Sequence, residues 1–166
     1  VFRGVIRDWV GKDVTLDALS PNVFNALGGV GARDENGKKI SANSHSIVVR
    51  VSHKSGIKAL LAADMAQKTL DEIVSSGQDL AACTLIFPHH GGKPGTDFTT
   101  DVSNRLMDAV KPSTVLFSNG RGKHGNPRPE IIASVCSKSK TYVACTQISE
   151  NCHSQNLKQD RGSFPF

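Results

Sequence analysis

The chain has 166 residues, of which 38% are hydrophobic and 21% are charged. No stretch approaches the roughly 18 consecutive apolar residues of a membrane-spanning helix, and the composition is that of a folded domain, not a disordered polyelectrolyte. Lysine and arginine number 20 against 15 acidic residues, and the resulting net charge of +5 mildly favours polyanionic partners such as nucleic acid. We expect one folded domain with no membrane contact.

The predicted elements change character along the chain. Two β-rich runs around a turn at 11–13 predict a hairpin within residues 3–19, residues 22–43 read as a loop, and strands are predicted at 46–51 and 57–62. Helices are then predicted at 66–75, 101–110 and 129–138, alternating with strands at 80–87, 114–117 and 141–145. The apolar run 80–87 is typical of a strand buried on both faces. This order predicts a layered α/β domain over 1–146 and a tail over 147–166.

The cysteines indicate the compartment and a second candidate site. They form no C-x-x-C pair, and the sequence has no signal peptide with a basic start and an apolar core, which predicts a reducing, cytoplasmic setting. Cys136, Cys145, Cys152 and His153 could form a structural zinc site if the tail folds back over the last helix and strand. The alternative is that Cys136 and Cys145 pack as small core residues, as we expect for Cys83.

Polar residues follow three of the predicted strands directly. Asp64 follows the strand at 57–62, His89 and His90 follow the strand at 80–87, and residues 118–127 follow the strand at 114–117. Because open α/β sheets place their sites at the carboxyl ends of strands, these residues form one candidate site.

Each of these clusters has a functional and a structural interpretation. Asp64 either caps the following helix or binds a ligand, and its spacing alone favours the cap. Of the two histidines, one can face the site while the other orients it, since imidazole is a common zinc ligand and carboxylates bridge metal pairs. Alternatively, they are loop histidines with no metal. The glycines and cations of 118–127 suit an anionic substrate, but a surface turn explains them nearly as well.

Several motifs together resemble one family. They are Asn43-Ser44-His45-Ser46, Leu60-Leu61-Ala62-Ala63-Asp64, Ile86-Phe87-Pro88-His89-His90-Gly91-Gly92, Phe117-Ser118-Asn119-Gly120 and Gly125-Asn126-Pro127-Arg128-Pro129-Glu130. In this order they resemble the second half of metallo-β-lactamase-fold hydrolases, and most closely the subgroup found at the end of ComEC-like competence (DNA-uptake) proteins. The resemblance covers residues from about 40 to 146.

The resemblance implies a four-layer αββα sandwich with one or two zinc or manganese ions that activate a water for hydrolysis. Asp64 falls on the family's metal-bridging carboxylate, and His89 and His90 fall on the segment that lines the site. Where the family has Gly-His-Pro, this chain has Asn126 between Gly125 and Pro127, with His124 as a substitute histidine. The substrate charge would be met by Arg121, Lys123 and His124, with Asn126 beside them.

One motif of the family is missing. The His-x-His/Asp-x-Asp-His metal motif of the first half of the fold occurs nowhere in this sequence. We expect it upstream of Val1 in a longer parent chain, or in a second chain that completes the sandwich. Half of a sandwich would expose an apolar sheet face and favour assembly with the missing half. A competing interpretation is a degenerate relative that has lost the chemistry.

The sequence thus predicts a metal-dependent hydrolase, or its second half, that acts on a phosphodiester or similar anionic substrate. Its metal and catalytic residues would be Asp64, His89 and His90. The alternative is a non-catalytic module that uses the same fold to bind nucleic acid or a partner protein.

Overall fold

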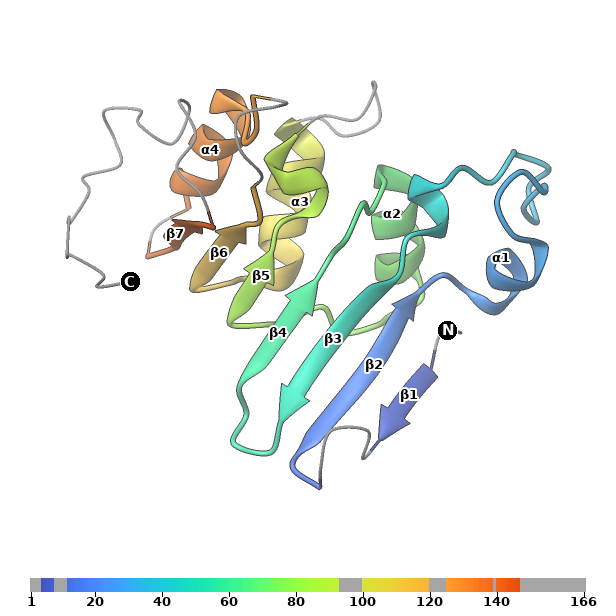
Figure 1. The fold of residues 1–166 in the computed structure, drawn as a ribbon, viewed down its shortest axis with the longest axis horizontal. Coiled ribbons are helices and arrows are strands. Elements are labelled where there is room, and N and C mark those ends of the chain that lie inside the picture. The colour runs from blue at the N-terminus through green and yellow to red at the C-terminus, as the bar shows by residue number, and fades with distance from the viewer. Residues whose placement is uncertain (1–3, 8–11, 93–99, 120–124, 139, 147–166) are drawn as a thin grey trace.

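The computed structural model describes residues 4–7, 12–92, 100–119, 125–138 and 140–146. Seven strands form one sheet, in which the order across the sheet is the order along the chain. They are β1 (Gly4–Arg7), β2 (Val14–Ser20), β3 (Val48–His53), β4 (Lys58–Leu61), β5 (Thr84–Ile86), β6 (Thr114–Phe117) and β7 (Tyr142–Cys145). The helices are α1 (Val23–Gly28), α2 (Gln67–Ser75), α3 (Thr100–Val110) and α4 (Pro129–Cys136), with 3-10 turns η1 (Asn43–His45) and η2 (Pro88–Gly91) (Figure 1).

The sheet changes its pairing at β4. Strands β1 to β4 pair antiparallel, with Val49 opposite Leu61, whereas β4 to β7 pair parallel, with Leu61 opposite Ile86. The change follows from the connections, because short turns join antiparallel neighbours and a helical crossover is needed to join parallel ones. The predicted α/β class is confirmed, with α2, α3 and α4 each lying between two parallel strands.

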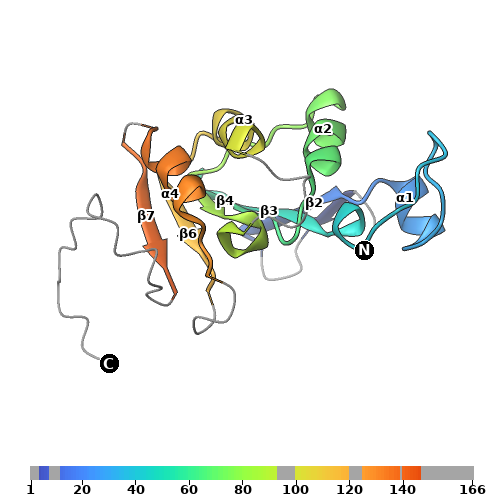
Figure 2. The ribbon, with the colours of Figure 1, turned by 90° about the horizontal axis from the view of Figure 1, so that it is seen from above.

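The helices α2, α3 and α4 all cover the same face of the sheet, as Figure 2 shows. Each presents an apolar stripe to it, such as Leu70 and Ile73 of α2. The strand residues beneath are completely buried, among them Leu60, Leu85 and Val115. The hydrophobic core therefore lies between this face and the three helices.

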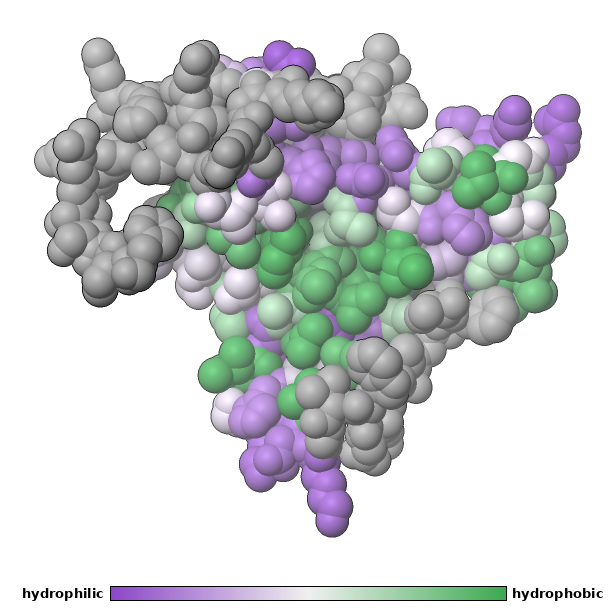
Figure 3. Space-filling view, in the orientation of Figure 1, coloured by the Kyte–Doolittle hydropathy of each residue, from purple (hydrophilic) through white to green (hydrophobic). Residues whose placement is uncertain are grey.

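The opposite face of the sheet carries apolar side chains that no described helix covers. The alternation of the strands and their register place on it Val14, Leu16, Ala18, Val49, Val51, His53, Ala59, Leu61, Thr84, Ile86, Thr114, Leu116, Tyr142 and Ala144. None of these positions in β2 to β7 holds a lysine, arginine, aspartate or glutamate, and Figure 3 shows the resulting apolar patch. Leu61 at its centre is 40% exposed. We call these residues the open sheet face.

Two predicted segments differ from the structure. Strand β5 is shorter than 80–87, and only Leu85 is fully buried while Thr84 and Ile86 are half-buried, because helices cover one face of the sheet only. The predicted loop 22–43 contains α1, whose N-cap Asn22 accepts a hydrogen bond from the Asn25 amide at 2.8 Å.

The described residues build a sheet with helices on one face, and a four-layer sandwich is not seen within them. Among the helices of the described part, none is both long enough and apolar enough to cross a bilayer.

Candidate functional site

The parallel pairing of β4, β5 and β6 brings the segments that follow them to one edge of the sheet. The Ala62 amide donates to Ile86 O at 3.3 Å and the Phe87 amide to Leu116 O at 2.9 Å, which continues the ladder past the strand ends. One step further, the His89 amide donates to Ala63 O at 3.0 Å. The residues after β4 are thereby fixed against those after β5.

Asp64 does not cap a helix, so this part of the sequence interpretation is wrong. The N-cap of α2 is Ala66, which makes no side-chain cap, and Asp64 lies two residues earlier with its side chain 57% exposed. Its carboxylate instead faces His89, with 3.4 Å between Asp64 Oδ1 and His89 Nδ1. The carboxylate is thus directed toward the histidine at the end of the neighbouring strand.

The surroundings of His89 fix the state of its ring. The residue is only 8% exposed, and this burial lowers the pKa of the imidazole, against the opposing effect of the Asp64 carboxylate. The ring is therefore neutral near pH 7. Because Nε2 lies 3.0 Å from Met65 O and a carbonyl can only accept, Nε2 carries the proton. Nδ1 faces a carboxylate oxygen, and the Asp64 carboxylate opposes the effect of burial on the pKa of the ring. Either a proton or a metal ion between these two atoms makes the contact favourable.

The distance between Asp64 Oδ1 and His89 Nδ1 and the chemistry of the two atoms suit two ligands of one metal ion. A tetrahedral zinc with Zn–N and Zn–O bonds of about 2.1 Å places two ligand atoms about 3.4 Å apart. A histidine that binds a metal also commonly donates its second ring N–H to a backbone carbonyl, as His89 does to Met65. Within the described ranges, however, no three or more His, Cys, Asp or Glu side chains group together as a metal site would require. The remaining ligands would have to come from elsewhere.

His90 is exposed and turned differently. Its Nδ1 donates to Ser118 O, which leaves Nε2 as an acceptor. His89 and His90 both adopt left-handed backbone conformations, with φ of 53° and 56°, and Ala63 opposite has φ of 47°. Such conformations cost about 1 kcal/mol or more each for residues other than glycine and are typical of functional sites.

Asn126, expected at the substrate, contacts the backbone of the site instead. Its Nδ2 donates to His89 O at 3.4 Å, and the Arg128 amide donates to Gly91 O at 2.9 Å. The segment 125–128 is therefore held against η2 by these two hydrogen bonds. This contact was not predictable from the motif, which says only that the segment is near the site.

The other predicted site residues separate into two groups. Arg121, Lys123, His124, Cys152 and His153 lie outside the described residues. Cys83, which was expected in the core, is on the surface, with its Sγ 2.9 Å from Lys58 O. Cys136, for which core packing was one of two alternatives, is on the surface too. Cys145 is half-buried.

Two further polar groups were not singled out from the sequence. His45 Nε2 and the side-chain amide of Asn119 are buried without a hydrogen-bond partner among the described residues. His45 precedes β3 and Asn119 follows β6, so both lie toward the edge of the sheet that carries Asp64. Both belong to motifs that carry the family resemblance, but their burial is evident only from the structure.

In comparisons with known proteins, no family model and no curated protein sequence matches this chain.

Proposed function

We propose that this chain carries part of the metal site of a metal-dependent hydrolase. The observation that supports the proposal best is the pair formed by Asp64 Oδ1 and His89 Nδ1, two electron-pair donors 3.4 Å apart at the edge of the sheet. A divalent cation between them, zinc or manganese, would take the place of a proton there and use the ring tautomer that the Met65 carbonyl favours. The substrate would be a phosphodiester or another anionic ester, in keeping with the net charge of +5.

The residues of this chain would have distinct roles. When bound, the metal would supply a water of lowered pKa as the nucleophile. Asp64 and His89 would bind the metal ion, and Asn126 would keep the His89 backbone in its left-handed turn. His90 Nε2, an acceptor at the surface, would take up a proton from the reaction. Substrate contact by Arg121, Lys123 and His124 stays a prediction from the sequence.

The proposed metal site needs further ligands, and the open sheet face needs a covering layer. A second folded unit would supply both. A metal held by Asp64 and His89 has two protein ligands, whereas a catalytic zinc uses three. Parallel strands such as β4 to β7 are normally covered on both faces. We therefore propose that the missing first half of the fold packs on the open sheet face and brings the remaining ligands, in the same parent chain or from a second chain. This would complete an αββα sandwich, in the cytoplasm as the cysteines predict.

Metal binding tests the proposal directly. The affinity of the purified chain for zinc and manganese would be measured by isothermal titration calorimetry, and its metal content by ICP-MS. We expect the double substitution Asp64→Asn, His89→Gln to weaken zinc binding at least about tenfold, because both donors are lost.

A matched control is the pair Asp13→Asn, His53→Gln, at the opposite end of the sheet, where Asp13 pairs with Lys54 and His53 contacts Ser55. This variant loses the same residue types and should bind zinc as the unmodified chain does. Equal affinities in all three proteins would overturn the proposal. If the site variant alone binds weakly, hydrolysis of bis(4-nitrophenyl) phosphate would be assayed next, with and without added metal.

The open sheet face also favours a second candidate, a non-catalytic module that binds a protein or nucleic acid. An uncharged apolar face spanning β2 to β7 suits protein assembly whether or not a metal is present. Binding of a partner or of DNA that persists in excess EDTA, together with no zinc affinity, would favour this module over the hydrolase.

A further inference from the structure

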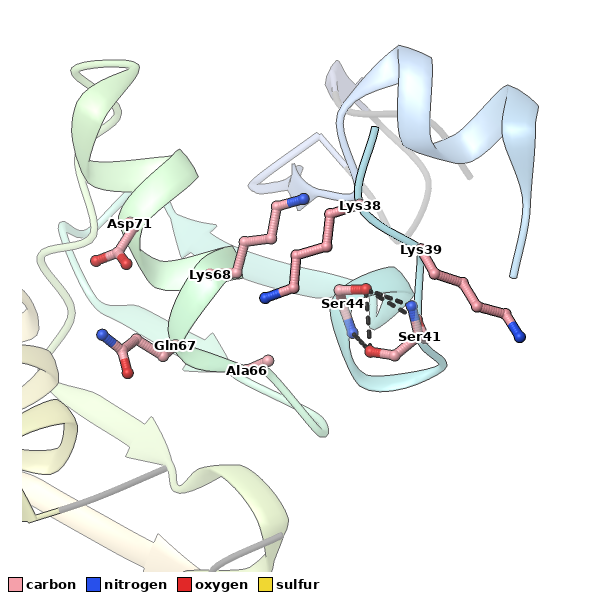
Figure 4. Close-up of a pocket in the computed structure, with 8 residues that line it drawn as sticks. All are labelled: Lys38, Lys39, Ser41, Ser44, Ala66, Gln67, Lys68 and Asp71. Atoms are coloured by element: carbon pink, nitrogen blue, oxygen red, sulfur yellow. Dashed lines mark hydrogen bonds between the residues drawn. The ribbon is translucent and has the colours of Figure 1, made fainter. Parts of the chain in front are cut away.

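A polar pocket of about 440 Å³ lies between the segment 38–44 and the start of α2. It is lined by Lys38, Lys39, Ser41, Ser44, Ala66, Gln67, Lys68 and Asp71. Its volume falls within the range of small-ligand sites. In Figure 4, Lys38 and Lys68 extend toward each other from opposite walls, and the side chain of Lys39 points outward.

The charges of the pocket do not cancel. Lys68 forms ion pairs with Asp34, whose side chain is 1% exposed, and with Glu72 at 3.5 Å. Asp71 is paired with Arg105. In the described part of the chain, the ammonium groups of Lys38 and Lys39 have no carboxylate within ion-pair distance. They are therefore the two charges left for a ligand.

The uncharged groups of the pocket also suit an oxyanion. Ser41 and Ser44 lock the loop in place, with their Oγ atoms 3.1 Å apart and each accepting the other's backbone amide. The amide of Gln67 begins α2, whose N-cap Ala66 supplies no side-chain acceptor. The first N–H groups of a helix then point outward and carry partial positive charge. Lys38 extends toward this end of α2 in Figure 4.

We propose that this pocket binds a phosphate group, held by Lys38 and the backbone N–H groups of the first turn of α2, with the charge of Lys39 at the rim. Phosphate binding itself does not depend on the metal site. That the phosphate belongs to the substrate rests on the proposed function, and the position of the pocket supports it. Ala66 of the pocket wall is two residues from Asp64, so their Cα atoms are at most about 7 Å apart. A phosphodiester chain with one phosphate in the pocket would present a neighbouring bond near Asp64.

The test is a binding measurement with two probes in EDTA, so that metal plays no part. Inorganic phosphate would be titrated by NMR, and a fluorescein-labelled oligothymidylate by fluorescence anisotropy over a range of salt. The variant is Lys38→Gln, Lys39→Gln. The control is Lys12→Gln, Lys54→Gln, which removes the same charge at the opposite end of the sheet. We expect the pocket variant to bind about tenfold more weakly, and its salt slope for the single strand to fall by about 1.4.

The results distinguish a free phosphate from a nucleic-acid strand as the ligand, and they test the pocket separately from the metal site. Loss of affinity in the pocket variant alone supports the pocket, and the probe that responds identifies a free phosphate or a strand. No binding of either probe, or equal weakening in both variants, overturns it. The Asp64→Asn, His89→Gln protein should keep its phosphate affinity, so failure of the metal proposal would leave this result intact, and the reverse also holds.

Discussion

Gly91 packs so closely against Pro127 that a Cβ atom on Gly91 would lie 2.4 Å from the Cβ of Pro127. The Phe117 ring would be only 2.8 Å away, and Gly91 has a φ of +75°. This contact joins η2, which carries the two histidines, to the segment before α4. The position of the histidines therefore depends on the lack of a side chain at residue 91.

Gly91→Ala should lower the free energy of unfolding by about 2–5 kcal/mol, because a left-handed alanine and the displacement of Pro127 both cost energy. Urea denaturation measures the change. Gly56→Ala is the matched control, since Gly56 has a φ of +89° with no atom within 4 Å of the added Cβ. It should cost only about 1–2 kcal/mol. Equal losses would show that the contact with Pro127 relaxes freely.

Helices α3 and α4 are joined by a buried hydroxyl pair. Ser134 Oγ lies 2.9 Å from Ser103 Oγ and 2.8 Å from Asn104 Oδ1, and Ser103 is fully buried. Either Ser103→Ala or Ser134→Ala should cost about 1–3 kcal/mol, because the remaining hydroxyl loses a partner without gaining water. In a double-mutant cycle, we expect the double variant to cost less than the sum of the two single changes. Strict additivity would contradict this coupling.

Stability at acid pH should depend on Asp79. Its pKa is lowered below the ordinary 3.8 by the Ala81 amide, by the hydrogen bond from Lys58 and, more weakly, by Arg50. A carboxyl group with a lowered pKa in the folded state stabilises the fold above the unfolded pKa, and this contribution is lost as the pH falls through the folded value. The stability difference between the native chain and Asp79→Asn should therefore shrink below about pH 4. Glu35→Gln, which removes one exposed carboxylate, is the control in urea denaturation at each pH.

His89 should act in a different pH window. Burial lowers the pKa of its imidazole below 6.5, so the unfolded chain binds a proton more readily than the folded one. The free energy of unfolding of the metal-free protein should decrease as the pH falls from about 6.5 toward the folded pKa of His89. Below that pKa, His89 should cause no further decrease. Melting temperatures of the native chain and His89→Gln in EDTA, from pH 8 to pH 5, measure this. An equally steep fall in both proteins would rule out His89 as its cause.

The open sheet face should make the isolated chain associate. Leu61→Lys places a charge at its centre and should raise the proportion of monomer in sedimentation velocity, since Leu61 is 40% exposed and its replacement leaves no buried cavity. Val74→Lys on α2, where Val74 is 48% exposed, changes an apolar residue on the helical side and should leave association unchanged. A monomeric native chain at high concentration would contradict the expectation.

The sequence was most informative where its periodicity was strong. The apolar periodicity of α2, α3 and α4 and the apolar runs of β4, β5 and β6 predicted the crossovers. The rule that sites lie at the carboxyl ends of strands predicted that Asp64 lies near His89. The left-handed turn at His89 and His90 was not predictable, since residues other than glycine adopt positive φ angles in only a few per cent of cases. Helix α1 was missed because its six residues follow an asparagine within a glycine- and asparagine-rich stretch.

The pocket beside α2 was not predictable from local sequence patterns. Lys38 and Lys68 are 30 residues apart and belong to a loop and a helix, so neither spacing nor charge clustering relates them. Their juxtaposition comes from tertiary contacts, such as the ion pair between Lys68 and Asp34.

The strand order has a consequence for how the chain folds. Since every strand pairs with the one before it in sequence, the sheet can grow by adding one element at a time to an existing edge. Each strand pairs only with its neighbours in the chain, but each parallel pair must close a helical crossover, and parallel pairings of this kind form more slowly than short hairpins. A nascent chain leaving the ribosome could therefore form β2, β3 and β4 while α3 and the later strands are still being synthesised.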